Sequence, residues 1–186
     1  MSEPSVADPA AARVLQVRRP IAASPAAIFE VLVSPAGHVA IDASGMLMSA
    51  GGDPVGAVGD RFTVQMDREA LQDFPLGEYE VDVVITRFEQ NRAISWGIES
   101  TLLQPPIGHV YGYELEPIDG GTLVTSTYDW TDIHPDWEAA VDAIFPVVSE
   151  TNLRATLGIL ARTVAPGLGR PETNLPDASL PDAGEG

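Results

Sequence analysis

Residues 108–130 read GHVYGYELEPIDGGTLVTSTYDW, and this stretch predicts a β-hairpin. Asp119-Gly120 is a strong signal for a tight two-residue turn. Such a turn would place Ile118 opposite Gly121 and thereby fix every later pair along the two strands. The predicted pairs are then Leu115 with Val124, Tyr113 with Ser126, Tyr111 with Tyr128, and His109 with Trp130.

The predicted hairpin gathers aromatic rings that end in a polar group. It holds three of the chain's four tyrosines and one of its three tryptophans. A dry core favours Leu, Ile, Val and Phe, because a buried phenol hydroxyl needs a hydrogen-bond partner. In the predicted register the rings share one face, and the residues of the other face suit solvent. That other face would carry Glu114, Glu116, Thr125, Thr127 and Asp129.

Five further strands are predicted before the hairpin. They cover residues 13–22, 45–51, 59–66, 77–88 and 92–100. The last three alternate apolar with polar side chains and are bounded by Gly, Pro or Asn. One face of the resulting sheet is therefore apolar and the other polar. The apolar face would include Tyr79, Val81, Val83 and Ile85 from one strand, and Ile94, Trp96 and Ile98 from the next.

Helices are predicted on both sides of this run of strands. Two short ones, AAIFEVLVS (26–34) and PAGHVAIDAS (35–44), follow the first strand. Ser24-Pro25 supplies an N-cap and a proline at the first helical position. After the hairpin, residues 137–164 (WEAAVDAIFPVVSETNLRATLGILARTV) predict one long helix that begins near Asp136 and is kinked at Pro146.

Length and composition indicate one domain with tails. The chain has 186 residues, of which 45% are hydrophobic, and this suffices for a single core. We assign residues 13–165 to the domain. Residues 1–12 and 166–186 are rich in Pro, Gly, Ser and acidic residues, a composition that cannot offset ordering entropy by burial. We predict that both segments are disordered tails.

The charge balance excludes several classes of partner. The chain has 27 acidic residues against 10 arginines and no lysine, for a net charge of −17. This disfavours nucleic acid and anionic membranes, which need clustered cations. No run of apolar residues is long enough for a stable membrane insertion, and no basic leader is present, so we expect a cytoplasmic protein. The absence of cysteine excludes disulfides and thiol nucleophiles.

Three segments together resemble the START-like superfamily, also called SRPBCC or polyketide cyclase/dehydrase-like. They are SPAAIFEVLVSPAGHVAIDASG after the first strand, GTLVTSTYDW as the last strand, and LRATLGILARTV at the end of the closing helix. The resemblance covers roughly residues 13–164. It implies an α+β helix-grip fold, in which a curved antiparallel sheet of about seven strands wraps around a long C-terminal helix.

The resemblance also implies a deep cavity between sheet and helix. Rings that offer both a π-face and a hydroxyl suit the wall of a pocket for an apolar or aromatic molecule. The alternative is that these rings fill the core, with their hydroxyls at its rim. Our candidate ligand-binding residues are Tyr79, Trp96, Tyr111, Tyr113, Tyr128, Trp130, Phe145 and the polar Asn152.

The sequence contains one weak candidate for catalysis. His38 and Asp42 are four residues apart, which would place them on one helical face, where the carboxylate could orient the imidazole as a general base. The alternative is an ordinary pair on the helix surface. His38, His109 and His134 show no metal-ligand spacing and no nucleotide fingerprint is present, so we predict neither a metal site nor a cofactor.

Three functions fit this pattern. The first is the binding of a hydrophobic small molecule such as a lipid, polyketide or aromatic metabolite, which would allow the protein to act as a carrier that transports it. The second is a polyketide cyclase or dehydratase that uses tyrosine hydroxyls and His38 for proton transfer. The third is a protein-interaction module, for which members of the superfamily provide precedent. Transfer of any of these activities by fold is analogy, and the sequence leaves the oligomeric state open.

Overall fold

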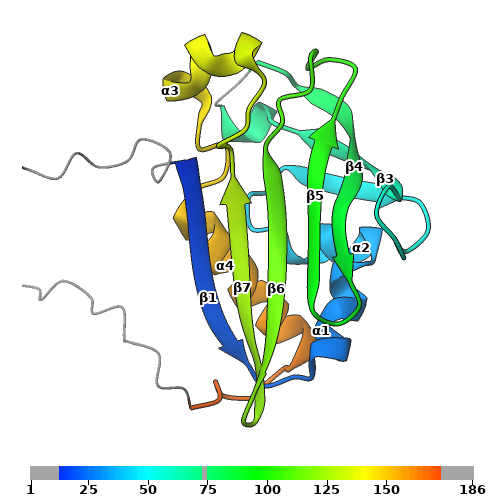
Figure 1. The fold of residues 1–186 in the computed structure, drawn as a ribbon, viewed down its shortest axis with the longest axis vertical. Helices are drawn as coiled ribbons and strands as arrows, with labels where there is room; N and C mark the ends of the chain where they lie inside the picture. Colours follow the sequence, from blue (N-terminus) through cyan, green and yellow to red (C-terminus); the bar gives the residue numbers. More distant parts are fainter. Residues whose placement is uncertain (1–12, 73–74, 173–186) are drawn as a thin grey trace, which may run out of the picture.

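The chain folds around one curved antiparallel sheet (Figure 1). A computed structural model describes residues 13–72 and 75–172. Within them the strands are β1 (Val14–Ile21), β2 (Leu47–Gly51), β3 (Arg61–Asp67), β4 (Glu78–Glu89), β5 (Ala93–Glu99), β6 (Val110–Ile118) and β7 (Gly121–Asp129). Their order across the sheet is β1-β7-β6-β5-β4-β3-β2, so only β1 joins the sheet out of sequence order. The predicted helix-grip fold is confirmed.

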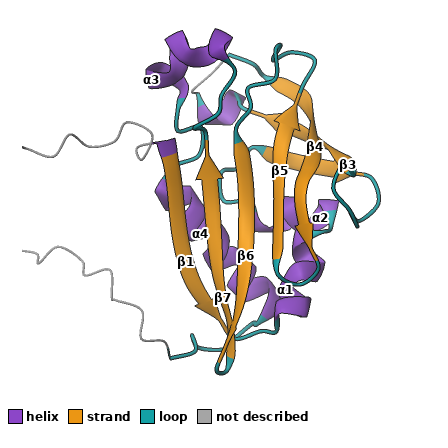
Figure 2. Cartoon of the chain, viewed as in Figure 1, coloured by secondary structure: helices purple, strands orange, loops and turns teal. Residues whose placement is uncertain are grey.

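Two short helices follow β1, as predicted: α1 (Pro25–Leu32) and α2 (Pro35–Ile41). Each begins with proline after a serine N-cap. The Ser24 hydroxyl accepts a hydrogen bond from the Ala27 N–H, and the Ser34 hydroxyl accepts one from the Gly37 N–H. These caps satisfy N–H groups that lack a partner within the helix. The two helices lie beside the sheet at the end opposite α3 (Figures 1 and 2).

The hairpin has the register that the turn predicted. Ile118 faces Gly121, Tyr113 faces Ser126 and Tyr111 faces Tyr128. Gly120 has a φ of 74°, the left-handed conformation that glycine adopts without strain. One detail of the prediction was wrong. Thr125 lies on the outer face but is buried, because its sheet partners Arg18 on β1 and Glu114 on β6 flank it on both sides.

The predicted single C-terminal helix is also wrong. A 3-10 helix η3 (Pro135–Ala140) and a short α3 (Val141–Ile144) come first, the chain is then non-helical around Pro146, and α4 (Glu150–Val164) follows. Proline lacks the N–H that a helix interior requires, and its ring clashes with the preceding turn. Here it therefore interrupts the helix instead of kinking it, and Ser149 caps a new one.

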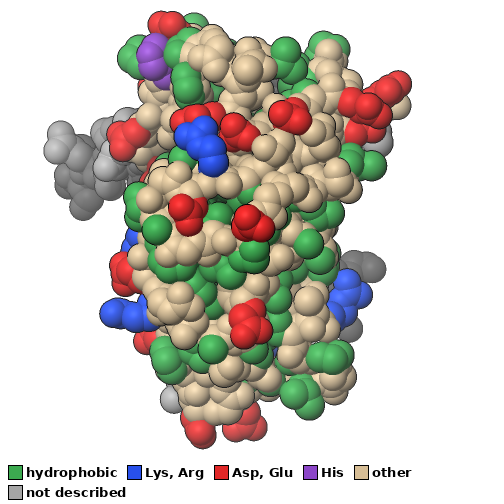
Figure 3. Space-filling view, turned by 90° about the vertical axis from the view of Figure 1, so that its right-hand side faces the viewer, with side chains coloured by type: hydrophobic (Ala, Val, Ile, Leu, Met, Phe, Trp, Pro, Cys, Tyr) green, Lys and Arg blue, Asp and Glu red, His purple; other side chains and the backbone are tan. Residues whose placement is uncertain are grey.

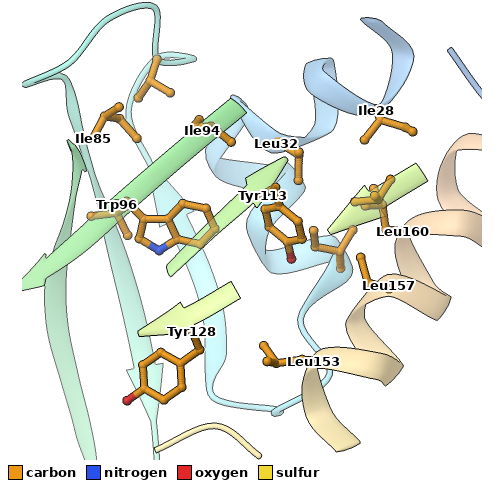
Figure 4. Packing of buried hydrophobic residues seen from close by; sticks show 14 of the residues in the cluster. Ile28, Leu32, Ile85, Ile94, Trp96, Tyr113, Tyr128, Leu153, Leu157 and Leu160 are labelled. Carbon is orange, nitrogen blue, oxygen red and sulfur yellow. The ribbon is translucent and has the colours of Figure 1, made fainter. Parts of the chain in front are cut away.

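Helix α4 is the element that the sheet grips. It buries Leu153, Leu157 and Leu160 in the core, and Figure 4 shows these three leucines along the side of the helix that faces Tyr113. α4 packs mainly against β1 and α2.

Acidic side chains are spread over the outside of the described structure. Figure 3 shows acidic side chains scattered over one face with few basic ones among them, in keeping with the net charge of −17. On the outer face of the sheet, Arg87 pairs with Glu89 and with Glu114 at 2.9 and 2.7 Å. Such exposed pairs contribute little to stability. None of the helices within residues 13–72 and 75–172 has the length and apolar character to cross a membrane.

The predicted tails lie mostly outside the described residues. This applies to residues 1–12 and to 173–186. Residues 166–172 are described and form no helix or strand, and Pro171 lies near Gly120 and Gly121 at the hairpin turn. These seven residues therefore run back along the end of the sheet.

Candidate functional site

A cavity of about 350 Å³ lies between the concave face of the sheet and the helices α2 and α4. Its wall is mainly aliphatic and aromatic, with a small number of polar groups. Strands β2 to β7 supply one side, and α2, α4 and residues 144–148 supply the other. Small-molecule sites in proteins are typically concave, apolar and of 300–1,000 Å³, with few polar groups that fix orientation.

Four of the eight predicted ligand-binding residues line this cavity: Tyr79, Trp96, Tyr111 and Tyr113. Tyr128, Trp130, Phe145 and Asn152 do not belong to its lining. Figure 4 shows Trp96, Tyr113 and Tyr128 on neighbouring strands of the sheet, with Leu153 of α4 across from Tyr128. The alternation along the strands thus predicted the face of each ring but not its depth.

Three of the four remaining residues form a second row behind the wall. The Tyr128 ring stacks on that of Tyr111 with a centroid separation of 4.4 Å and an interplanar angle of 8°. Trp130 lies 5.0 Å from Tyr128, and Phe145 stacks on Trp130 at 6.1 Å. Tyr128 has no exposed surface. This row therefore supports Tyr111 in the wall, and stacked rings of this kind contribute beyond their buried area.

Tyr128 also orients His109, which lines the cavity. The Tyr128 oxygen lies 3.0 Å from Nδ1 of His109. Burial raises the pKa of Tyr128 well above its usual value, although hydrogen bonds from the Tyr111 hydroxyl and the Val147 N–H to its oxygen lower it. The hydrogen bond between this oxygen and Nδ1, together with the edge contact of the two rings, holds the imidazole in place.

The Nε2 atom of His109 is buried and has no hydrogen-bond partner among the described residues. Burial lowers the pKa of His109 to about 4, so the ring is neutral at neutral pH. Its edges contact Tyr111, Tyr128 and Phe145. A buried polar atom without a hydrogen bond costs roughly 1–3 kcal/mol, and the sequence pattern gave no indication of this group.

His38 and Asp42 do not form the predicted pair. Helix α2 ends at Ile41, and Asp42 has an extended backbone, so the spacing of four no longer places the two side chains on one helical face. The Asp42 carboxylate accepts hydrogen bonds from the Ser44 N–H and hydroxyl at 2.8 and 2.6 Å and from the Leu47 N–H at 3.1 Å. It therefore fixes the turn into β2. Both residues nevertheless line the cavity.

His38 is not a surface residue either, since only 7% of it is exposed. Its ring lies between those of Phe62 and Trp96, with centroids at 4.9 and 4.7 Å. Nε2 lies 2.7 Å from the Leu32 carbonyl oxygen, to which it donates. Burial lowers the pKa of His38 to about 4, although the bond to Leu32 raises it in part. The ring is thus held as a neutral group.

Asn152 has a structural role at the start of α4. Its side-chain oxygen accepts hydrogen bonds from the Ser149 N–H and hydroxyl, and its own N–H is bound by the Ser149 hydroxyl. The amide nitrogen donates to the Ala43 carbonyl at 3.3 Å. Both polar ends are therefore used, and we remove Asn152 from the candidate site. Glu150 and Arg154, one turn apart on α4, form an exposed ion pair.

Arg68 lines the cavity and was missed in the sequence. It is 4% exposed, and its Nη1 lies 2.6 Å from the Met46 sulfur. The alternation of β3 buries Phe62 and Val64 and continues through Met66, so residue 68 falls on the same face. That pattern extends one step beyond the predicted strand, and following it would have placed a cation in the cavity.

The phenols of the wall are held in their neutral form. Burial raises the pKa of Tyr113 to about 12, while a hydrogen bond with the Ser126 hydroxyl lowers it and the Asp42 carboxylate raises it. Burial also raises the pKa of Tyr111 far above its usual value. Neutral phenols can donate a hydrogen bond to a ligand as well as accept one. Among the described residues, no group of three or more His, Asp or Glu side chains is arranged to hold a metal ion.

Comparison with protein-family models finds no match, and comparison with curated proteins finds none either. Solved structures do match. The Aha1 dimer from Colwellia psychrerythraea has a TM-score of 0.54 at 20% identity, over 84% of this chain and 98% of that chain. A protein from Chromobacterium violaceum has a TM-score of 0.59 at 13% identity, over 82% and 97%.

An AHSA1-like protein from Aeromonas hydrophila also matches, with a TM-score of 0.51 at 18% identity, over 81% of this chain and 91% of that chain. Each of these likenesses spans nearly the whole neighbour and most of this chain. At such low identity they establish the helix-grip fold and nothing about the ligand.

Proposed function

We propose that this protein is a START-like, SRPBCC-type protein that binds an apolar or aromatic small molecule, such as a lipid or polyketide, in the cavity between the sheet and α4. The observation that carries the proposal is the cavity itself. It has a volume of about 350 Å³, and apolar side chains surround a few convergent polar groups. This arrangement is the usual one for a small-molecule site.

Binding accounts for the wall better than proton-transfer catalysis does. In the cyclase hypothesis His38 shuttles protons, yet its Nε2 proton is committed to the Leu32 carbonyl and burial disfavours the charged ring. Asp42, its intended partner, is bound to Ser44 and Leu47. The phenols of Tyr79, Tyr111 and Tyr113 remain as groups that position a ligand by hydrogen bonding.

The first test fills the cavity with a larger side chain from its own wall. Ile98 lines it on β5, and Ile98→Trp should occupy much of its volume. We expect wild-type protein to bind the neutral dye N-phenylnaphthylamine with a stoichiometry of one, measured by fluorescence titration. Ile98→Trp should weaken binding about tenfold or more, a loss of roughly 1.4 kcal/mol or more.

The matched control is Val58→Trp. Val58 is 61% exposed and lies outside the lining, so this change adds the same ring without entering the cavity. Dye affinity should then equal that of the wild type. Equal dye binding by wild type and Ile98→Trp would show that the dye binds elsewhere, and the proposed site would be wrong.

A further inference from the structure

The backbone fixes which ring nitrogen of His38 carries the proton. Nε2 lies 2.7 Å from the Leu32 carbonyl oxygen. A carbonyl oxygen accepts hydrogen bonds and cannot donate them, so Nε2 carries the proton of the neutral ring. Burial lowers the pKa of His38 to about 4, and the ring is therefore neutral at pH 7. Nδ1 then has only a lone pair, which accepts a hydrogen bond and cannot donate one.

Nδ1 of His38 has no donor of its own among the described residues. Two other buried side-chain nitrogens there also lack a partner, Nε of Arg19 and Nε2 of His109, but both are closed off from accessible space. Nδ1 of His38 is not closed off in this way. Because His38 is only 7% exposed and lines the cavity, the space that reaches Nδ1 is the cavity.

The ring of His38 is also held in a fixed direction. It contacts the rings of Phe62 and Trp96 edge-on, with interplanar angles of 60° and 74°, and the bond to Leu32 prevents it from turning over. A group that is already ordered loses little conformational entropy when a ligand binds to it. Nδ1 is therefore a preorganised acceptor in the wall of the cavity.

Trp96, which contacts His38, offers the complementary group. Its indole nitrogen is a donor only. No described residue accepts a hydrogen bond from it, and this nitrogen is not closed off from accessible space either. Trp96 is 8% exposed and lines the same cavity. Two rings in contact thus present an acceptor without a donor and a donor without an acceptor.

Other polar groups of the wall already have partners within the protein. The Asp42 carboxylate accepts hydrogen bonds from Ser44 and Leu47. The indole N–H of Trp137 donates to the Pro105 carbonyl at 2.9 Å. A ligand would have to break these bonds before it could use either group, whereas the free nitrogens of the two rings require no such exchange.

We propose that the ligand of this cavity is an apolar molecule with a hydroxyl group, which donates a hydrogen bond to Nδ1 of His38 and accepts one from the Trp96 indole N–H. This inference rests on the proposed function and narrows its ligand class. A hydroxyl both donates and accepts. An ether or a carboxylate has no proton to give, so it leaves Nδ1 unpaired, and such a loss reduces affinity. His38 recognises the ligand without transferring a proton.

The test compares two probes with the same ring system, 2-naphthol and 2-methoxynaphthalene. Each is titrated at pH 7 against the protein loaded with N-phenylnaphthylamine, and displacement of the dye gives its affinity. Apolar burial alone favours the ether, because it carries an additional methyl group. We nevertheless expect 2-naphthol to bind the wild type about tenfold more tightly.

Three variants test whether His38 causes this preference. In His38→Gln the amide nitrogen can still donate to Leu32, but no acceptor remains at the position of Nδ1, so the preference should disappear. His38→Asn has its amide oxygen near that position and should keep part of the preference. His134→Gln is the control, because His134 has an exposed side chain and does not belong to the lining. Both affinities should equal those of the wild type.

A spectroscopic measurement on the wild type tests the hydrogen bond itself. The NMR resonance of an unprotonated ring nitrogen shifts when a donor binds to its lone pair. We expect 2-naphthol to shift the Nδ1 resonance of His38 and 2-methoxynaphthalene to leave it nearly unchanged. The chain has three histidines, so His109→Gln and His134→Gln assign this resonance by elimination. If the His38 variants do not fold, this shift and the wild-type affinities still decide.

The outcomes distinguish this inference from the proposed function. If the ether binds the wild type as tightly as 2-naphthol does, the inference is overturned and the apolar binding function stands. If His38→Gln keeps the full preference, or 2-naphthol leaves the Nδ1 resonance unchanged, the hydroxyl is bound elsewhere and the inference again fails. If neither probe displaces the dye, both proposals fall together.

Discussion

The two buried histidines make stability depend on pH in a defined direction. Burial lowers the pKa of His38 and of His109 from the ordinary 6.5 to about 4. Between these two values the unfolded chain binds more protons than the folded one, so stability falls as pH falls through this window. At pH 5 the cost is about 2 kcal/mol for each histidine. We expect urea denaturation to show this loss between pH 7 and pH 5.

Substitution of each histidine tests whether His38 and His109 cause this loss of stability. His38→Gln and His109→Gln should each reduce the difference in unfolding free energy between pH 7 and pH 5, whatever they do to stability at pH 7. His134→Gln is the control, because the His134 side chain is exposed and its Nδ1 accepts a hydrogen bond from the nearby Asp136 N–H. A pH dependence that is identical in wild type and both buried-site variants would contradict the assignment.

At the level of single residues, the sequence predicts the face of a side chain better than its partners. Alternation placed Tyr79, Trp96, Tyr111 and Tyr113 correctly on the concave face, because the period of a strand is two wherever it runs. It could not show that Tyr128 lies behind Tyr111, since depth depends on the curvature of the sheet and on the segment that covers it. His38 was misjudged for a related reason: its partner, the Leu32 carbonyl, belongs to another helix.

At the level of elements, α4 depends on the cap at its N-terminus. Ser149 and Asn152 form a reciprocal capping box, and Asn152 also donates to Ala43. Ser149→Ala should lower the free energy of unfolding by about 1 kcal/mol, because N–H groups of the first turn lose their acceptor. Asn152→Ala should cost a similar amount and leave the affinity for N-phenylnaphthylamine unchanged.

Thr151→Ala is the matched control within the same turn. Thr151 is exposed and takes no part in the cap, so denaturation should be nearly that of the wild type. A large loss of dye affinity in Asn152→Ala, with little change in stability, would return Asn152 to the binding site. Equal stability of Ser149→Ala and Thr151→Ala would show that the cap contributes little.

The interrupted C-terminal helix shows where periodicity fails. Apolar residues recur at helical spacing on both sides of Pro146, so the pattern alone predicts one helix. Whether a proline kinks or ends a helix depends on whether neighbours can satisfy the freed backbone groups. Here Ser149, with a hydroxyl that can cap, offers a new start three residues later. The serine followed three residues on by Asn152 was visible in the sequence but was read as part of the helix.

At the level of the whole molecule, the interruption and the cavity belong together. Residues 145–149 are not helical, so Val147 and Val148 line the cavity from an irregular segment that follows Ile144 at the end of α3, while α4 packs against β1. A continuous helix would present a regular surface to the sheet. The alternation of the strands and the turn residues specify the fold, and the fold sets the position of the site. Which residues line the site depends on the interruption of the helix at Pro146.

Ligand binding should therefore be linked to the stability of the entire fold. A molecule that binds only the folded chain stabilises it by RT ln(1 + [L]/Kd), about 2.7 kcal/mol at a concentration of 100 Kd. We expect N-phenylnaphthylamine at that concentration to raise the urea midpoint of the wild type accordingly. Ile98→Trp should show little shift at the same dye concentration, because its cavity is filled, whereas Val58→Trp should respond as the wild type does. If the dye binds without any shift in the urea midpoint, it associates equally with the unfolded chain. This result would contradict the prediction that dye binding at the cavity stabilises the fold.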